Sequence, residues 1–391
     1  MKVLHLYANH KWTGPAELAL QLARGLQTGS QVSGTALDLQ FALAGFVHPG
    51  MQHAMRARAE ELGVHTREGL ALRRHLHLPS LLADAARLGS WIQTEGIELL
   101  HCHQSGDHLL AALARSLSRP IPIVRSYWEE SVGSAWPRQA YAFAATAAVL
   151  TPFEDLVGPL VDSESLATGR VLLQEPLMQM PAAAGEAERA DARAAVLAEL
   201  GLDERVHLVG ITARIQRRRR WDLLWDLVCE CSQADPAFQL LVLGRPDEGV
   251  FAEICERPLQ ERGVLDRVHF LGYRRGDAYR QALVALDAFL FLVPGSDPTC
   301  RALREAMALG LPAVTSDLGH LSTIVQDDVT GFCRAPVATS MSQALLYLLR
   351  DEARRKTMGA SARRQAEERW GGDRQIQQTR SLYESLLGGP P

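Results

Sequence analysis

Residues 207–244 read HLVGITARIQRRRRWDLLWDLVCECSQADPAFQLLVLG and contain one strand–helix–strand unit. Apolar and β-branched residues at 207–213 and 239–244 predict two buried strands, because short continuous apolar runs are typical of parallel sheets. Between these strands, the apolar residues of 221–231 recur with a helical period. Two strands joined by a crossover helix predict parallel pairing in an α/β layer.

The same alternation of short strands and longer helices extends over nearly the whole chain. Residues 180–188 interrupt it, since they are rich in Ala, Pro and Gly and lack periodicity, which is typical of a linker. We therefore expect an α/β fold with two doubly wound parallel-sheet domains, 1–179 and 180–370, that face a central cleft. Residues 351–384 read as charged helices, and we expect the helix at 371–391 to pack back on the first domain. The other expected strands are 3–7, 98–101, 121–125, 147–150, 268–271, 288–293 and 313–316.

Composition limits the classes of function. A length of 391 residues suggests two domains, and 47% hydrophobic residues are enough to form large cores. The formal charge of −4 gives no overall attraction to nucleic acids or anionic membranes, so any site for a polyanion has to be local. The six cysteines include no C-x-x-C pair, which favours reduced thiols. Because the chain starts with a strand-like run and not a signal peptide, we expect a cytoplasmic protein, with peripheral contact to the inner face of a membrane left open.

The loop after the strand at 207–213 is rich in arginine. Five arginines stand within seven residues, from Arg214 to Arg220, directly before the helix at 221–231. Guanidinium groups and a helix N-terminus both bind phosphate oxygens, so this loop is suited to a diphosphate. The alternative is a solvated basic turn. The position at a strand end, where open α/β sheets bind their ligands, favours the diphosphate.

A second loop carries two carboxylates. Residues 294–312 read PGSDPTCRALREAMALGLP, with Asp297 in the loop and Glu305 near the start of the following helix. A carboxylate accepts two hydroxyl hydrogen bonds at once, so one group is suited to sugar hydroxyls and the other to ribose hydroxyls. The alternative for Glu305 is an acidic residue favoured by the helix dipole.

Residues 295–331, GSDPTCRALREAMALGLPAVTSDLGHLSTIVQDDVTG, resemble the donor-site signature of family 4 glycosyltransferases of the group 1 type. Residues 209–224, VGITARIQRRRRWDLL, are similar to the Gly-Arg-Leu-x-x-x-Lys-Gly segment of that family. The N-terminal half matches mainly through residues 1–26 and through IELLHCH at 97–103. The resemblance implies the GT-B fold, in which two Rossmann-like domains face a central cleft.

The resemblance assigns roles to residues of both loops. Arg214 falls on the family arginine and Arg219 on the family lysine, the pair that holds the donor diphosphate. Glu305 falls on the glutamate that binds the nucleotide ribose. Asp297 occupies the position beside the donor sugar and is one methylene shorter than the usual glutamate. Arg214, Arg219 and Asp297 are therefore the expected catalytic residues, while Arg220 stands where the family usually has a glycine.

Main-chain amides complete the expected donor site. The backbone of Thr299, Cys300 and Arg301 falls where the family wraps amides around the sugar and phosphate. In the first domain, Gly14 follows the strand at 3–7 and permits a tight turn into a helix whose amides would face the donor phosphates or the acceptor. A glycine turn that opens a helix is also common without any ligand.

Three further residues are candidate contacts for the sugar or the acceptor. His103 belongs to a His-x-His segment like that of the family, whose first histidine, His101, we expect to pack in the core. The family commonly has a histidine after the strand at 121–125, where Tyr127 and Trp128 stand in this chain. An indole can stack on a sugar but cannot exchange protons. We expect no bound metal, because His-x-His alone lacks a third ligand.

The resemblance implies a retaining glycosyltransferase with a UDP-, GDP- or ADP-linked sugar donor and a carbohydrate or lipid-linked acceptor. The setting it implies is glycolipid, exopolysaccharide or lipopolysaccharide synthesis, with the nucleotide sugar as co-substrate and no cofactor. Nucleic acid is not an expected partner, because the arginine loop has no interleaved aromatic residues. The alternative function is a non-catalytic nucleotide-sugar binder or a subunit of a glycosylation complex. A basic patch suits an anionic or lipid-linked acceptor, with a solvated loop as the alternative: Arg67, Arg73, Arg74, His75 and His77.

Overall fold

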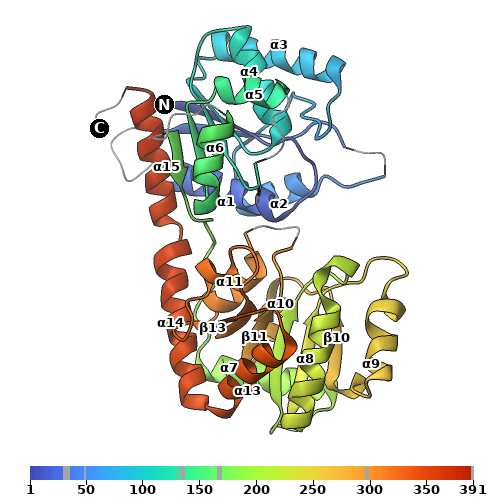
Figure 1. Cartoon of the computed structure of the whole chain (residues 1–391). Coiled ribbons are helices and arrows are strands. Elements are labelled where there is room, and N and C mark those ends of the chain that lie inside the picture. The colour runs from blue at the N-terminus through green and yellow to red at the C-terminus, as the bar shows by residue number, and fades with distance from the viewer. Residues whose placement is uncertain are drawn as a thin grey trace. The chain divides into compact units, whose positions relative to one another are not determined.

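The structure, a computed structural model, describes residues 1–29, 36–47, 50–129, 131–132, 137–164, 170–295 and 299–388. Two compact units make up the chain (Figure 1). The first unit combines Met1–Gln179 with Arg369–Pro391, and the second is Met180–Glu368. Each unit has its own parallel sheet and its own core.

A seven-stranded sheet forms the centre of the first unit. Its strands are β1 (Lys2–Leu6), β2 (Asp38–Ala42), β3 (Thr66–Arg67), β4 (Leu99–Cys102), β5 (Ile123–Ser126), β6 (Ala148–Thr151) and β7 (Val171–Leu173). They are parallel and follow the order β3-β2-β1-β4-β5-β6-β7. The direction in which strands are added therefore reverses between β1 and β4, which is where doubly wound sheets bind ligands.

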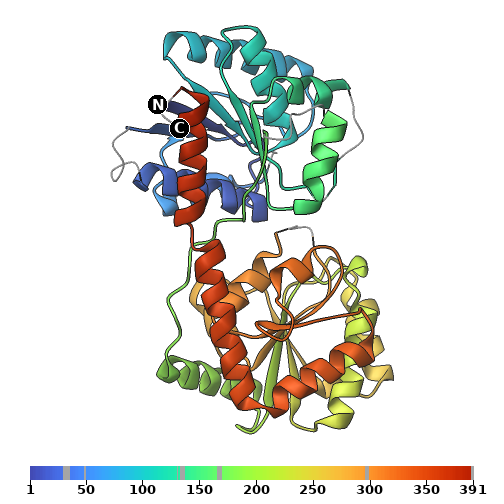
Figure 2. The ribbon, with the colours of Figure 1, turned by 60° about the vertical axis from the view of Figure 1, so that its left-hand side comes forward.

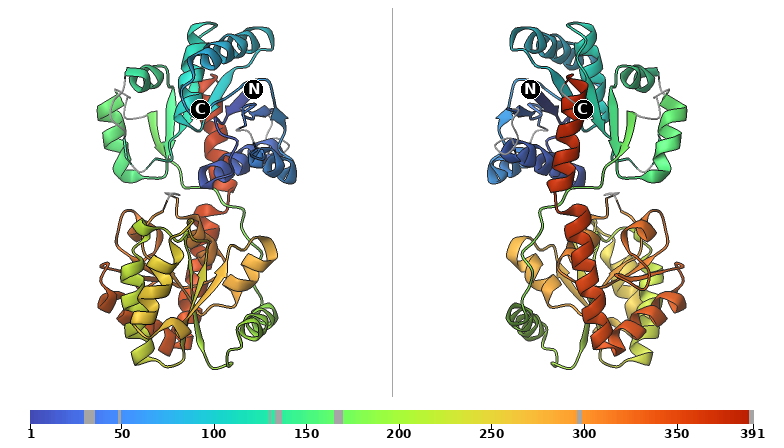
Figure 3. Two further views of the ribbon diagram at one scale, coloured as in Figure 1. Left: turned by 90° about the vertical axis from the view of Figure 1, so that its right-hand side faces the viewer. Right: turned by 90° about the vertical axis from the view of Figure 1, so that its left-hand side faces the viewer.

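Helices lie on both faces of this sheet (Figure 3). They are α1 (Gly14–Gly29), α2 (Ala54–Leu62), α3 (Leu78–Thr94), α4 (Ser105–Ser116), α5 (Pro137–Ala144), α6 (Val157–Glu164) and α15 (Asp373–Leu386). α15 packs against α1 (Figure 2). Gly25 allows this close approach, since a Cβ there would lie 2.3 Å from Cδ1 of Ile376. Gln174 Nε2 also donates a hydrogen bond of 2.8 Å to Thr379 Oγ1 of α15.

The second unit contains a six-stranded sheet. Its strands are β8 (His207–Thr212), β9 (Phe238–Leu243), β10 (Val268–Gly272), β11 (Ala288–Phe291), β12 (Ala313–Ser316) and β13 (Gly331–Arg334). They are parallel in the order β10-β9-β8-β11-β12-β13, so the reversal lies between β8 and β11. The helices are α7 (Glu186–Leu200), α8 (Trp221–Ala234), α9 (Arg257–Glu261), α10 (Gly276–Val284), α11 (Arg301–Ala308), α12 (Leu321–Ile324), α13 (Ala338–Arg350) and α14 (Glu352–Trp370).

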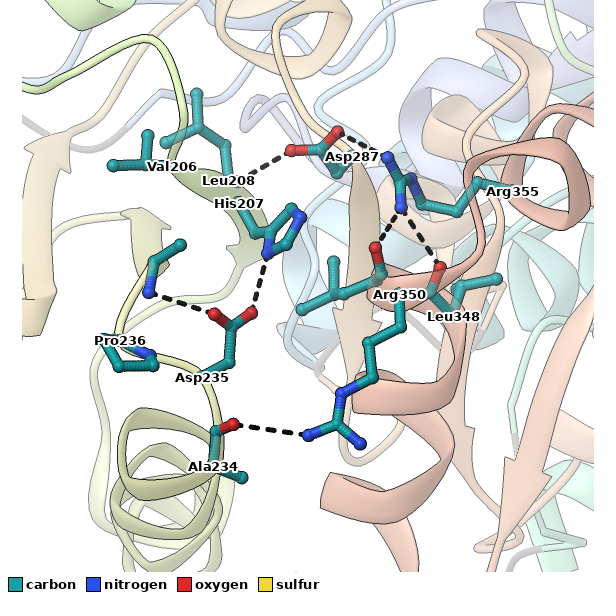
Figure 4. Close-up of polar contacts among 12 residues, drawn as sticks. Val206, His207, Leu208, Ala234, Asp235, Pro236, Asp287, Leu348, Arg350 and Arg355 are labelled. Carbon is teal, nitrogen blue, oxygen red and sulfur yellow. Dashed lines mark hydrogen bonds and ion pairs between the residues drawn. The ribbon is translucent and has the colours of Figure 1, made fainter.

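A polar network joins the elements at the amino ends of these strands (Figure 4). His207 Nδ1 lies 2.7 Å from the carboxylate of Asp235. Asp287 accepts a hydrogen bond of 2.8 Å from the backbone N–H of Leu208 and pairs with Arg355 at 3.6 Å. This network ties β8, α8 and the segment before β11 together. The loops at the opposite, carboxyl ends carry the predicted donor-site residues.

The strands predicted from the sequence are confirmed to within two residues at either end. Trp221 and Trp225 of α8 are buried in the core of the second unit at 3% and 1% exposure. The sequence pattern did not predict β2, β3, β7 or β13. Among the described residues, no helix combines the length and hydrophobicity that a membrane-spanning segment requires.

Candidate functional site

Two loops meet at the reversal point of the second sheet. One follows β8 and contains the arginine run, and the other follows β11. The guanidinium group of Arg219 lies against Gly295, so closely that a Cβ at Gly295 would be 1.8 Å from Nη1. Only glycine can occupy that position while Arg219 keeps this orientation. The predicted neighbour on the same loop, Asp297, lies outside the described residues.

The arginines of the first loop have different surroundings. Arg214 Nε lies 2.5 Å from Asp247, which follows β9, and its side chain is half exposed. Arg217 pairs with Glu253 at 2.5 Å, so its guanidinium group holds the loop against a neighbouring segment. Arg219 turns toward the loop after β11 instead. The five guanidinium groups therefore do not all gather around one ligand.

The backbone at Arg220 has a conformation that suits glycine, which is the residue that the family usually has at this position. This backbone is left-handed, with φ 55° and ψ 41°, directly before α8 begins at Trp221. Glycine adopts this conformation without the steric penalty of a Cβ, which is about 1–2 kcal/mol for other residues. The turn into α8 is thus kept although Arg220 strains it. The side chain lies beside Asp222, with Nε 3.6 Å from the carboxylate.

The second loop presents its main chain at the start of α11. Thr299 and Cys300 are 2% and 1% exposed, so their side chains are packed inside the unit. Cys300 is left-handed, with φ 50° and ψ 45°, and directly precedes α11 at Arg301. Arg304 Nε donates a hydrogen bond of 2.8 Å to the carbonyl of Thr299 and fixes the turn. What these residues can offer a ligand is backbone N–H groups at a helix start.

Glu305 is held within reach of the end of β8. Arg301 Nε lies 2.7 Å from Oε1 of Glu305 across one turn of α11. Tyr279 of α10 bonds to Thr212 Oγ1 at 3.2 Å, at the last residue of β8. Burial raises the pKa of Tyr279, and the nearby carboxylate of Glu305 raises it further. Thr212 and Tyr279 were not predicted as site residues; the one sequence signal was the polar residue at the end of β8.

In the first unit, Gly14 is the first residue of α1. The turn before it is fixed by Glu17, which is 2% exposed. Trp12 Nε1 donates to Glu17 at 2.7 Å, and Arg58 binds both oxygens of the same carboxylate at 2.9 and 2.7 Å. The turn at Gly14 is therefore rigidly held by side chains of α1 and α2.

The ring of His103, which we predicted to contact the sugar or the acceptor, is 1% exposed. Its Nε2 lies 3.1 Å from Nδ1 of His5, and Tyr383 Oη bonds to Nε2 of His5 at 2.9 Å and to Nδ1 of His101 at 2.5 Å. His101 is buried, as predicted. Burial lowers the pKa of His5 to about 3, and it also lowers the pKa values of His101 and His103 well below the ordinary value for histidine. These neutral rings join α15 to the sheet.

The structure places a third histidine beside the two of the His-x-His segment, which the sequence analysis did not expect. His-x-His was expected to lack a third imidazole, yet His5 of β1 brings one, and a nitrogen from each of the three rings lies within 4.8 Å of the others. Three neutral imidazoles are a ligand set that zinc accepts. In this structure most of these nitrogens already bond to Tyr383, to Ser126 or to one another.

Tyr127 and Trp128, the other two predicted contacts for the sugar or the acceptor, are also buried, at 4% and 6% exposure, so the indole of Trp128 offers no open surface for stacking in this structure. The hydroxyl of Tyr127 donates to the carbonyl of Ser131 at 3.0 Å, and its ring packs near Phe143. Tyr127 does line a cavity of about 270 Å³ within the first unit. Among the described residues, no acceptor bonds to the buried Nε1 of Trp128.

The basic patch of the first unit divides into two parts. Arg73, Arg74, His75 and His77 line the same cavity as Tyr127. Arg67 lies elsewhere: it pairs with Glu95, and its guanidinium carbon is 3.6 Å from the centre of the Trp91 ring. Four members of the patch therefore line one cavity, and three of them, Arg74, His75 and His77, are also exposed to solvent.

Comparison with known proteins supplies the family. Residues 193–365 match the family described as glycosyl transferases group 1. A D-inositol 3-phosphate glycosyltransferase of Salinispora tropica is 30% identical over 314 residues, which cover 75% of this chain and 60% of the relative. Residues 193–365 of this chain therefore belong to the group 1 glycosyltransferase family. The chain spans about 60% of the length of the first curated relatives that it matches.

Two further comparisons extend over nearly the whole chain. The N-acetyl-alpha-D-glucosaminyl L-malate synthase of Bacillus anthracis is 23% identical over 92% of the chain and 94% of the relative. The crystal structure of Anabaena Alr3699/HepE in complex with UDP has a TM-score of 0.80 at 16% identity and covers 98% of this chain and 100% of that one. With its two Rossmann-like parallel sheets, the group 1 glycosyltransferase has the GT-B fold.

Proposed function

We propose that this group 1 glycosyltransferase transfers a sugar from a nucleotide-sugar donor to an acceptor hydroxyl, with retention of the anomeric configuration. The observation that carries the proposal is the contact between Arg219 and Gly295 at the reversal point of the second sheet. It brings a cation to the loop between β11 and α11, and backbone N–H groups and the helix dipole at the start of α11 also favour a phosphate. A related fold, that of Alr3699/HepE, was solved in complex with UDP.

Each residue of the donor site has its own role in the proposed reaction. Arg219, with the backbone of Thr299 to Arg301, stabilises the charge that develops on the leaving diphosphate, and loss of one such contact costs about 3–4 kcal/mol in the barrier. Arg214 joins them by exchanging its partner Asp247 for a phosphate oxygen. Glu305 accepts hydrogen bonds from the ribose hydroxyls, and Asp297 from the donor sugar. In a front-side attack the leaving diphosphate takes the acceptor's proton, so no histidine base is required.

The proposed acceptor is a small anionic polyol or hydroxy acid, or a lipid that carries such a group. The relatives' names mention inositol 3-phosphate and L-malate, both of which have a hydroxyl close to a charged group. Another relative is named as a mannosyltransferase of lipopolysaccharide core biosynthesis. The nucleotide sugar acts as co-substrate, and the proposed reaction uses no further cofactor.

Donor binding and turnover test the proposal. A panel of UDP-, GDP- and ADP-sugars is assayed for donor hydrolysis and transfer, and UDP, GDP and ADP binding is measured by calorimetry. We expect one nucleoside diphosphate to bind selectively, and Arg219→Ala and Glu305→Ala to weaken it at least tenfold. Arg217→Ala is the matched control, because its side chain pairs with Glu253 and should leave affinity unchanged.

Two results would contradict the proposal. If Arg219→Ala and Glu305→Ala bind the diphosphate as the parent does, the site is placed wrongly. If a nucleotide sugar binds but is neither hydrolysed nor transferred with any acceptor of the named classes, the protein is the non-catalytic binder.

A further inference from the structure

The cavity of about 270 Å³ in the first unit lies among α3, α4 and α5 and the ends of β1 and β5. We infer that it binds the phosphate or carboxylate group of the acceptor. The inference rests on the proposed function and specifies where its acceptor is recognised. The volume is close to the lower end of the roughly 300–1,000 Å³ of small-molecule pockets, so the bound group is small.

Positive charge dominates the cavity lining. Four arginines contribute to it, Arg73, Arg74, Arg125 and Arg138, against one carboxylate, Asp84. The carboxylate of Asp84 is already used, because it accepts the backbone N–H groups of Ala71 and Leu72 at 2.9 and 3.0 Å. An anion entering the cavity would therefore meet an excess of guanidinium groups, which bind phosphate and carboxylate in bidentate fashion.

The arginines differ in how they are held. Arg125 is 1% exposed and binds Glu129 at 2.7 Å, so it is a fixed, buried charge. Arg73 lies over the ring of Phe46, 3.6 Å from its centre. Its buried Nε has no hydrogen-bond acceptor among the described residues. A buried guanidinium N–H without an acceptor is costly, and an anionic ligand oxygen is the natural partner for it.

The loop that carries Arg73 and Arg74 is built to hold them in place. Leu72, just before them, is left-handed at φ 42°, a strained conformation for a leucine. The two hydrogen bonds to Asp84 of α3 fix this turn. Across the loop, a Cβ on Gly106 of α4 would lie 3.2 Å from the carbonyl of Arg73, so α4 packs tightly against it. Such strain persists only where the surroundings impose it, which is common at ligand sites.

A second cavity of about 100 Å³ adjoins the first. The two share Leu72, Arg73, Arg74 and His75, and the smaller one adds Lys11 from the loop that follows β1. This loop also contains Gly14, the first residue of α1. An anion bound by Arg74 would thus lie between α3 and the loop after β1.

The same charged group could come from a soluble polyol or from a lipid. Three leucines in and next to the segment that lines the cavity are exposed, namely Leu76 at 54%, Leu78 at 60% and Leu82 at 60%. Leu76 lines the cavity itself, and the other two lie on one face of α3, one turn apart. A lipid acceptor would place its head group among the arginines and its chain along these leucines.

Calorimetry on the full chain tests the inference with inorganic phosphate, L-malate and D-inositol 3-phosphate, and with uncharged myo-inositol as the reference. We expect at least one charged probe to bind and myo-inositol not to bind. Arg74→Gln and Arg138→Gln should each weaken binding about tenfold or more, since hydrogen bonds to charged groups contribute about 1.5–3 kcal/mol. Arg24→Gln, on the exposed surface of α1 and outside the cavity, is the matched control and should bind as the parent does.

Vesicles of phosphatidylcholine with and without phosphatidylinositol distinguish the two sources. For a lipid acceptor, binding requires phosphatidylinositol and is lost both in Arg74→Gln and in a Leu78→Ser, Leu82→Ser double variant. For a soluble acceptor, the double variant binds the soluble probe normally. The inference is overturned if neither the charged probes nor the vesicles bind, or if they bind Arg74→Gln and Arg138→Gln unchanged.

Diphosphate binding separates this inference from the proposed function. It depends on residues of the second unit, so Arg74→Gln should leave it intact. Loss of the anion site with normal UDP, GDP or ADP binding therefore concerns the cavity alone. Failure to bind any nucleoside diphosphate would contradict the proposed function instead.

Discussion

Arg220 and Cys300 each hold a left-handed backbone just before a helix that faces the candidate donor site. Their side chains cost conformational energy there that a glycine would not. Arg220 is the more informative of the two, because its side chain is partly exposed and can be removed without opening a hole in the core.

The variant Arg220→Gly should raise the free energy of unfolding by about 0.5–1 kcal/mol, since it removes the Cβ strain but adds freedom to the unfolded chain. Urea unfolding followed by circular dichroism measures the change. Arg220→Ala is the control: it loses the guanidinium group but keeps the Cβ, so it should give no such gain. An equal gain in both variants would show that the side chain and not the backbone is responsible.

Gly295 is the second residue whose lack of a side chain matters. A Cβ would collide with the guanidinium group of Arg219, which is the flexible end of a side chain and can move away. Gly295→Ala should therefore weaken nucleoside diphosphate binding about tenfold while the melting temperature changes little. Gly158→Ala is the control, because a Cβ there meets no atom within 4 Å. Unchanged affinity in Gly295→Ala would separate Arg219 from the donor site.

Residue types and their order predicted which loops carry the site but not each side chain's direction. The sequence predicted that Arg219 and the segment of Glu305 each follow a strand, and the structure shows that these two strands are neighbours and that their loops meet. It could not show that Arg217 turns to Glu253, because that pairing depends on how a segment 36 residues away folds. Nor could the sequence show that the side chains of His103 and Trp128 are buried, because strand-end residues are exposed only when no helix covers them.

Elements follow the sequence pattern where they are long or central. The inner strands β1, β4, β8 and β11 were predicted because continuous apolar runs mark strands buried on both faces. The strands that were missed include three at sheet edges: β3, of two residues, β7 and β13. An edge strand has one neighbour and needs less apolar sequence, so it gives a weak signal.

A mutation can test how α15 is attached to the sheet of the first unit. Tyr383 bonds to both His5 and His101, and all three side chains are fully buried. Tyr383→Phe leaves two ring nitrogens without their partner and should lower the free energy of unfolding by about 1–3 kcal/mol. Tyr347→Phe, half exposed on α13, should change it by less than about 0.5 kcal/mol. Equal stability of the two variants would mean that the hydroxyl does not hold α15.

For the whole molecule, buried neutral histidines make stability depend on pH. Burial lowers the pKa of four histidines of the first unit: His5, His101, His103 and His108. The folded state keeps them neutral, while the unfolded chain takes up protons below its pKa of about 6.5. Their contribution to stability is therefore complete above pH 6.5 and is lost as the pH falls toward the lowered folded values.

Each of these histidines should add about 1.4 kcal/mol per pH unit to the loss of stability below pH 6.5. Urea unfolding at pH 7.5, 6.5 and 5.5 measures this slope. His108→Gln should reduce the slope by one proton, whereas His65→Gln, on the exposed surface, should leave it unchanged. A flat profile between pH 7.5 and 5.5 would contradict the burial of neutral rings.

The hydroxyl that bridges His5 and His101 has a consequence for biosynthesis. His5 precedes its partner Tyr383 by 378 residues along the chain, so the ribosome makes the histidine long before the hydroxyl that bonds to it. Residues 180–368 form the second unit without any residue of α15. They can therefore fold before α15 is synthesised, whereas the first unit cannot be completed until then. A chain truncated after residue 370 would therefore contain all residues of the second unit but would lack α15 of the first.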